Sequence, residues 1–263
     1  MRMNKVYFIL TTKCNKSCDF CYMRYNNVST SDINTLKSII DTIDHLIIIG
    51  GEPLLEKDRI FHILDMCKSV NEITITTNGS YLTRDFMNKV SYYTNTFIQV
   101  SIYDYMTAFK ISSILSDDDT RVIIHYVLSD NNIDIFRQTH KMFNKHKIWI
   151  SLDREIKHDI SCDIIELIDS GDITSNMFRD NKTVGKNCKV FSNRNIVING
   201  NNIVKDCLNR QSKGSKMIIN NNCLKCDNTL CDACLCDDIV LNRDVTCNIF
   251  KNIATKFKFM GEL

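Results

Sequence analysis

Three cysteines close to the N-terminus have the types and the spacing to bind a metal centre. Cys14, Cys18 and Cys21 lie in the segment TTKCNKSCDFCYM, spaced C-x₃-C-x₂-C. Four thiolates would complete a tetrahedral zinc or iron–sulfur site, whereas three leave one coordination position open. An open position suits a cluster that binds a substrate directly. The alternative interpretation is a zinc knuckle or an unligated group of thiols.

A second candidate site follows the apolar run Leu46–Ile49. The residues Gly50-Gly51-Glu52-Pro53 combine two glycines, which let a ligand approach the backbone closely, with a carboxylate that attracts a cation. Taken alone, this motif is more typical of a structural turn.

Polar residues also end later apolar runs. Thr76 and Asn78 lie in TTNG, and Ser101 follows Phe97–Val100. Asn78-Gly79 also reads as a plain turn, and Ser101 as a strand-end hydroxyl. His125 and Tyr126 are neighbours on another predicted strand, so their side chains point to opposite faces. One of them must face the interior of the fold, but the alternation does not say which.

The elements that position these residues alternate in type. Runs rich in β-branched and aromatic residues predict six strands, and helical periodicity predicts helices between them, with Ser31 and Thr83 as N-caps. The predicted strands are Val6–Leu10, His45–Ile49, Glu72–Thr76, Thr96–Ser101, Arg121–Leu128 and Lys147–Leu152. The predicted helices are Ser31–Thr42, Lys57–Ser69, Thr83–Ser91, Tyr105–Leu115, Ile133–Lys145 and Asp163–Asp169.

This alternation predicts an α/β fold built from six consecutive βα units with parallel strands, too few for the usual eight-stranded barrel. The candidate residues follow the carboxyl ends of strands, which is where chemistry occurs in parallel α/β barrels.

The C-terminal third has a different character. Eight cysteines lie between residues 188 and 247, in Asn- and Lys-rich sequence with few long apolar runs. This density predicts a small domain held together by metal, with a boundary between 1–180 and 181–263. Zinc sites are the alternative to iron, because C-x₂-C pairs also build zinc ribbons. Cys67 and Cys162 lie in apolar helical settings and are predicted to be buried small hydrophobes.

With Phe20 before the third cysteine, the first motif reads C-x₃-C-x-φ-C, where φ is aromatic. Together with the GGEP motif it resembles the radical S-adenosylmethionine (radical SAM) superfamily. The resemblance implies an open (βα)₆ partial TIM barrel and a [4Fe–4S] cluster on the three cysteines, whose fourth iron is chelated by the methionine part of S-adenosylmethionine (SAM). It implies that the cofactor is bound by Phe20, Gly50, Gly51, Glu52, Pro53, Thr76, Asn78 and Ser101.

The C-terminal cysteines resemble a SPASM domain, the auxiliary-cluster module of radical SAM enzymes that modify peptides and proteins. The resemblance implies one auxiliary [4Fe–4S] cluster on Cys223, Cys226, Cys231 and Cys247, and a second on Cys188, Cys207 and either Cys234 or Cys236. The unassigned member of that last pair is a candidate catalytic hydrogen donor. Gly200 lies further from Cys207 than the pattern requires, so Asn202 is an alternative turn residue.

The resemblance implies reductive cleavage of SAM to a 5′-deoxyadenosyl radical, followed by hydrogen abstraction from a peptide or protein. The expected products are a cross-link, a thioether, an epimerised centre or an oxidised side chain. An electron donor such as flavodoxin or ferredoxin is an expected partner. Because the first strand begins at residue 6, a precursor peptide is expected to be recognised either by a separate leader-peptide-binding protein or directly by this enzyme. The alternatives are a small-molecule dehydrogenase or isomerase, a glycyl-radical activating enzyme, and a metal-binding regulator.

Composition argues against a nucleic-acid-binding, a disulfide-bonded or a membrane-spanning protein. The formal net charge of +2 gives no basic footprint for nucleic acid, and thirteen cysteines without a signal peptide favour metal ligation over disulfides. No apolar run approaches the length of a membrane span, and the chain is therefore expected to be cytoplasmic.

Overall fold

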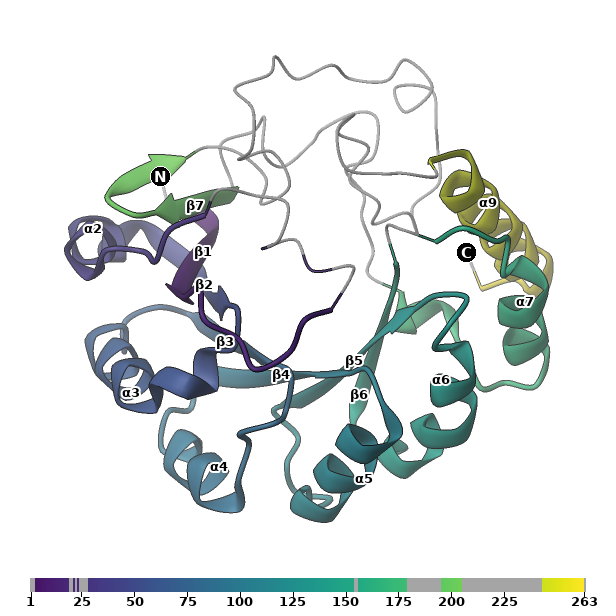
Figure 1. Ribbon diagram of the computed structural model, residues 1–263, viewed down its shortest axis with the longest axis horizontal. Coiled ribbons are helices and arrows are strands. Elements are labelled where there is room, and N and C mark those ends of the chain that lie inside the picture. Colours follow the sequence, from purple (N-terminus) through teal and green to yellow (C-terminus); the bar gives the residue numbers. More distant parts are fainter. Residues whose placement is uncertain are drawn as a thin grey trace. The chain divides into compact units, whose positions relative to one another are not determined.

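The computed structural model describes the backbone of residues 3–18, 21, 23, 28–153, 156–178, 195–204 and 243–262 (Figure 1). The chain forms two compact units. The first consists of Met1–Ser101, Ser113–Ile123 and Lys189–Ser215. The second consists of Ile102–Ser112, Ile124–Cys188 and Lys216–Leu263.

The strands of the first unit form a mainly parallel sheet. They are β1 (Met3–Thr11), β2 (Ile43–Gly50), β3 (Glu72–Thr77), β4 (Thr96–Ile102), β7 (Asn195–Asn199) and β8 (Asn202–Val204). Their order is β4-β3-β2-β1-β7-β8, and every neighbouring pair is parallel except β7 with β8. Parallel pairing brings the carboxyl ends of β1, β2 and β3 to one edge of the sheet.

Three helices cover one side of this sheet (Figure 1). They are α2 (Ile33–Ile39), α3 (Lys57–Met66) and α4 (Arg84–Ser91), with short 3₁₀ helices η1 (Ile40–Thr42) and η2 (Pro53–Glu56) between them. Thr83 caps α4 as predicted, since its side chain accepts a hydrogen bond from the N–H of Phe86. The predicted cap Ser31 is wrong: Asp32 caps α2, because its carboxylate accepts from the N–H of Thr35.

Both faces of the sheet are apolar, as expected for parallel strands. On one face Ile9, Ile47, Ile49 and Val197 form a buried cluster. Side chains alternate along a strand, so Phe8 points the other way, where the Arg59 guanidinium of α3 lies 5.9 Å from its ring centre.

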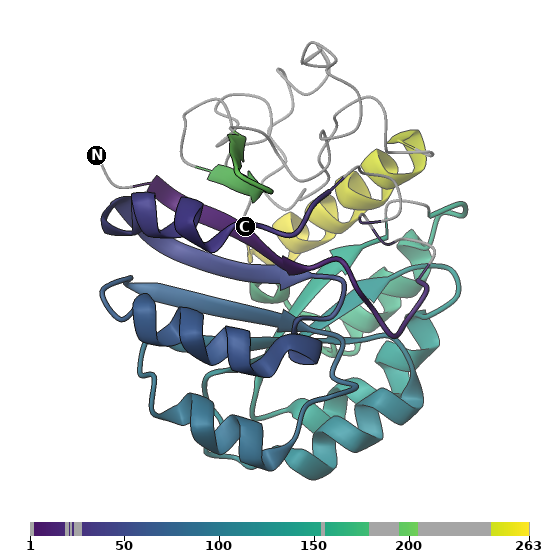
Figure 2. The same cartoon turned by 60° about the vertical axis from the view of Figure 1, so that its left-hand side comes forward.

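The strands β7 and β8 lie beside β1 in both views (Figures 1 and 2). Their connection is Gly200-Asn201, with Gly200 in the left-handed region at φ 58° and Asn202 already in β8. Gly200 therefore makes the turn, and the alternative of Asn202 is wrong. The Ser31 hydroxyl links β7 to β1. It accepts a hydrogen bond from the N–H of Ile9 on β1 and donates one to the carbonyl of Ile198 on β7.

The second unit contains two strands and four α-helices among its described residues. The strands are β5 (Val122–Leu128) and β6 (Lys147–Leu152), which are neighbours. The helices are α5 (Tyr105–Ile114), α6 (Ile133–Thr139), α7 (Ser161–Asp169) and α9 (Arg243–Met260), with 3₁₀ helices η3 (His140–Phe143) and η4 (Ser175–Met177). The helices α7 and α9 are in contact, and Asn252 donates a hydrogen bond to the hydroxyl of Ser161 at 2.9 Å.

These elements confirm the predicted α/β class and the six alternating βα units, consistent with a partial TIM barrel. The helices predicted at 31–42 and 133–145 each end in a 3₁₀ turn. The boundary between 1–180 and 181–263 stays a prediction, and most of the cysteine-rich segment lies outside the described residues. No helix that the structure describes is long and apolar enough to cross a membrane.

Candidate active site

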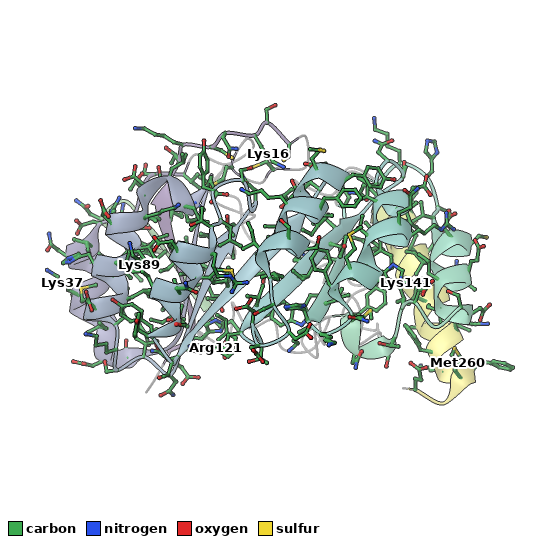
Figure 3. The ribbon with its side chains drawn as sticks, turned by 90° about the horizontal axis from the view of Figure 1, so that it is seen from below. Lys16, Lys37, Lys89, Arg121, Lys141 and Met260 are labelled. Atoms are coloured by element: carbon green, nitrogen blue, oxygen red, sulfur yellow. The ribbon has the colours of Figure 1, made fainter. Side chains whose placement is uncertain are left out.

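The cysteine loop, which carries Cys14, Cys18 and Cys21, begins where β1 ends. Cys14 is exposed, whereas Cys18 and Cys21 are half-buried, and the N–H of Cys21 donates to the carbonyl of Cys18 at 3.2 Å. The sulfur of Cys14 accepts a hydrogen bond from the backbone N–H of Lys16 at 3.4 Å. Lys16 is labelled on this loop in Figure 3.

The thiols of this loop are close enough to influence one another. Burial raises the pKa of Cys18, and the neighbouring thiols of Cys21 and Cys14 raise it further, while the Lys16 ammonium acts in the opposite direction. Thiolates that repel one another are stabilised by a bound cation, so this set of donors fits an iron cluster. Within the described ranges, however, no group of three His, Cys, Asp or Glu side chains is gathered as metal ligands. Ligation by all three cysteines therefore stays a prediction.

The glycine pair at the end of β2 lies directly against the cysteine loop. The N–H of Gly51 donates to the carbonyl of Thr11, and the N–H of Glu52 donates to the carbonyl of Lys13, both at 2.9 Å. A Cβ added at Gly51 would lie 2.3 Å from the Lys13 carbonyl oxygen and 2.9 Å from the Cβ of Cys14. No other residue type fits this position without moving the loop.

Glu52 is completely buried and is held by three protein donors. Its Oε1 accepts from the N–H of Leu54 at 2.9 Å and from the hydroxyl of Thr77 at 2.7 Å. Its Oε2 accepts from the N–H of Asn78 at 2.8 Å. Burial raises the pKa of this carboxyl, and the three hydrogen bonds act against that rise. Pro53 is buried beside it and begins η2.

The end of β3 reaches the same loop. The side-chain amide of Asn78 donates to Oδ1 of Asn15 at 2.9 Å and to the sulfur of Cys14 at 3.7 Å. Gly79 adopts φ 76°, which confirms the predicted turn. The hydroxyl of Thr76 instead donates to the carbonyl of Ile48 on β2 at 3.1 Å.

Three strand ends therefore meet at one place, which the structure assembles from Cys14, Gly51, Glu52 and Asn78. Thr77 and Asn15 belong to this network, although the sequence did not single them out. Ser101 is buried at the end of β4, with 7% of its surface exposed. Its role as a cofactor contact stays a prediction.

Other predicted residues lie elsewhere. Phe20, Cys188, Cys207, Cys223, Cys226, Cys231, Cys234 and Cys236 lie outside the described residues, and Cys247 lies in α9 with its side chain outside the description. Cys67 is buried as predicted, and burial raises its pKa to about 12. Cys162 is exposed on α7, so its predicted burial is wrong.

His125 and Tyr126 of β5 point to opposite faces of the strand. Tyr126 is buried, and its hydroxyl lies 2.8 Å from that of Thr139 on α6. His125 therefore faces away from that helix, and its Nε2 lies 2.8 Å from the hydroxyl of Ser151 on β6.

Comparison with known proteins agrees with this geometry. Residues 8–106 match the model of the radical SAM superfamily. Residues 8–106 thus resemble a radical SAM domain. This segment includes the cysteine loop, the GGEP motif and the end of β3. The match to this superfamily implies a [4Fe–4S] cluster and SAM as cofactors. The residues that would hold the cluster here are Cys14, Cys18 and Cys21.

Curated relatives match this chain over short stretches. A SAM-dependent nucleotide dehydratase from Fibrobacter sp. (strain UWH6) is 34% identical over 88 residues, which are 28% of this chain and 26% of the relative. A GTP 3′,8-cyclase from Peptoclostridium acidaminophilum is 33% identical over 93 residues, 31% of this chain and 29% of the relative. The matches thus span less than a third of either relative.

A solved structure extends the likeness in fold. Streptococcus suis SuiB bound to the precursor peptide SuiA has a TM-score of 0.57, with 11% identity over 87% of this chain and 66% of that chain. At this identity the likeness concerns the fold alone.

Proposed function

We propose that this chain is a radical SAM enzyme that abstracts a hydrogen atom from a peptide or protein substrate. The observation that carries the proposal is the meeting of the cysteine loop, the Gly50–Pro53 segment and Asn78 at adjoining strand ends. Cys14, Cys18 and Cys21 would hold a [4Fe–4S] cluster, which would supply the one electron needed for reductive cleavage of SAM.

The chain's own residues bind, orient and shield the reactants. Gly50 and Gly51 let the end of β2 pack against Thr11 and the cysteine loop, because a Cβ at either glycine would lie 2.3 Å from a backbone carbonyl oxygen. In this proposal the methionine ammonium binds at this strand end, next to the loop that would carry the cluster. Glu52 contributes negative charge to this place. Thr76, Asn78, Ser101 and Phe20 complete the cofactor contacts. Glu52, Asn78 and Ser101 are buried, and their burial would help to exclude water from the reactive radical.

The peptide substrate is supported by two features. The C-terminal cysteines follow a SPASM-like pattern, which is associated with modification of peptides and proteins, and SuiB shares the fold and binds the precursor peptide SuiA. In this proposal residues 1–180 form the radical SAM barrel and residues 181–263 carry one or two auxiliary clusters. Flavodoxin or ferredoxin delivers the electron, and a separate protein presents a leader peptide.

A nucleotide substrate is the second candidate. Its support is that two curated relatives are named a nucleotide dehydratase and a GTP cyclase. The matches to these relatives cover under a third of their lengths, so the peptide proposal is preferred.

Co-expression and mass spectrometry test the proposal. The chain is co-expressed with short peptides encoded beside its gene, and each peptide is analysed for a mass change, such as loss of two hydrogens on cross-linking. We expect a modified peptide with the wild-type chain and none with Cys14, Cys18 and Cys21 replaced by Ala. Unmodified peptides, together with turnover of GTP or another nucleotide by the anaerobic protein, would instead support the nucleotide candidate.

A further inference from the structure

The amide of Asn78 lies between the end of β3 and the first cysteine of the loop. Its Nδ2 donates to the sulfur of Cys14 at 3.7 Å, a distance suited to an N–H···S hydrogen bond, and to Oδ1 of Asn15 at 2.9 Å. Asn78 is 8% exposed, so the donor is buried, whereas the acceptor residue Cys14 is exposed. The Cys14 sulfur therefore accepts two N–H groups, one from Asn78 and one from Lys16 at 3.4 Å.

Every polar group of Asn78 that could fix its orientation is engaged. Its Oδ1 accepts from the N–H of Ser80 at 2.9 Å, and its backbone N–H donates to Oε2 of Glu52 at 2.8 Å. The side chain cannot turn its carbonyl toward Cys14 without breaking the bonds to Asn15 and Ser80. The residue thus holds a donor, and no acceptor, against the sulfur.

A donor in this position affects electron transfer. Reducing an iron–sulfur cluster adds negative charge, part of which resides on the ligating sulfurs. An N–H that points at such a sulfur stabilises the reduced form more than the oxidised form, and hydrogen bonds to sulfur are among the known determinants of cluster potential.

We propose that Asn78 is a positioning residue whose amide N–H, bonded to Cys14, raises the reduction potential of the cluster on the N-terminal loop. This inference rests on the proposed function, because it requires a cluster at Cys14, Cys18 and Cys21. It assigns Asn78 a role toward a cluster ligand in addition to any contact with SAM.

Redox titration followed by electron paramagnetic resonance tests the proposal. The signal to be followed is the one that the triple Cys14/Cys18/Cys21→Ala variant lacks, in anaerobically reconstituted full-length protein without SAM. Asn78→Ala removes the donor, and Asn78→Asp removes the donor while keeping an oxygen for the N–H of Ser80. We expect both variants to have a lower midpoint potential. The expected decrease is about 59 mV, which corresponds to a tenfold change in the one-electron equilibrium constant.

Two control variants separate this effect from general loosening. Thr74→Val removes the hydroxyl that meets His45 at 2.8 Å on the same strand, away from the loop, and should leave the potential unchanged. Asn15→Ala removes the second partner of Asn78 but keeps the N–H···S bond, so its shift should be smaller than that of Asn78→Ala.

An unchanged potential in both Asn78 variants, with the signal intact, would overturn the inference. Loss of the signal from both variants would also overturn it, because Asn78 would then be needed for loop folding. If the wild-type protein itself lacks the signal, the proposed function fails instead.

Discussion

The buried carboxylate of Glu52 accepts a hydrogen bond from the backbone N–H of Asn78 at 2.8 Å, and so ties the end of β2 to the end of β3. The N–H of Glu52 in turn donates to the carbonyl of Lys13 on the cysteine loop. One residue thus connects three strand ends, and its loss should affect both the fold and the site.

Glu52→Gln should lower the free energy of unfolding by about 1–3 kcal/mol, the usual cost of leaving a buried donor without an acceptor. The amide has one oxygen where the carboxylate has two, so the donors Leu54, Thr77 and Asn78 cannot all be satisfied. Urea unfolding followed by circular dichroism measures this change. Asp58→Asn, at an exposed carboxylate of α3, is the matched control and should change stability by less than about 0.5 kcal/mol. Equal stabilities of the two variants would contradict the prediction.

The pH dependence of stability should also reveal Glu52. Burial raises its pKa, so the folded chain binds this proton more tightly than the unfolded chain. The resulting stabilisation is complete below the ordinary carboxyl pKa and is lost as the pH rises through the raised value. The Gln side chain of Glu52→Gln does not titrate. The free energy of unfolding of the wild type, relative to that of this variant, should therefore decrease as the pH rises from the ordinary carboxyl pKa through the raised pKa of Glu52. Urea titrations between about pH 4 and pH 8 measure it. A relative stability that increases with pH would show that the sign is wrong.

Several features of the fold followed from the sequence, and others did not. The six β-branched runs became strands because each fits a pleated, buried environment, and Thr83 became a cap because its hydroxyl faces a free helix N–H. Ser31 failed as a cap because tertiary contact with β1 and β7 uses its hydroxyl. The parallel pairing of β7 with β1 joins segments about 190 residues apart, which periodicity cannot indicate.

The helix α9 was missed although its sequence carried a signal. Its buried residues Ile249, Phe250, Ile253, Ala254 and Phe257 recur at helical spacing. At the site, the cysteines and glycines were recognised from spacing. The bonds of Glu52 to Thr77 and of Asn78 to Cys14 depend on strand register, which local sequence does not specify.

Gly51→Ala should displace the cysteine loop. Its Cβ would lie 2.3 Å from the Lys13 carbonyl oxygen, a contact that the backbone can relieve only by moving, at about 1–3 kcal/mol. We expect the iron content of the anaerobically reconstituted variant to fall toward that of the triple cysteine variant. Gly171→Ala is the control for backbone strain alone, because Gly171 has φ 77° but a Cβ there meets nothing within 4 Å. Equal iron contents in the two alanine variants would contradict the role assigned to Gly51.

Iron analysis tests the auxiliary clusters. Three [4Fe–4S] clusters require about twelve iron atoms per chain, and replacing Cys14, Cys18 and Cys21 by Ala should leave about eight. A wild-type value near four would remove both auxiliary clusters from the account. Zinc in place of iron in the triple variant would favour the zinc alternative for the C-terminal cysteines.

The most direct test of the central claim is formation of 5′-deoxyadenosine from SAM. Anaerobically reconstituted protein is reduced with dithionite, and the nucleoside is measured by liquid chromatography with mass spectrometry. The account predicts steady formation by the wild type and none by the variant with Cys14, Cys18 and Cys21 replaced by Ala. Equal formation by both proteins, or none by a wild type whose iron content is complete, would contradict it.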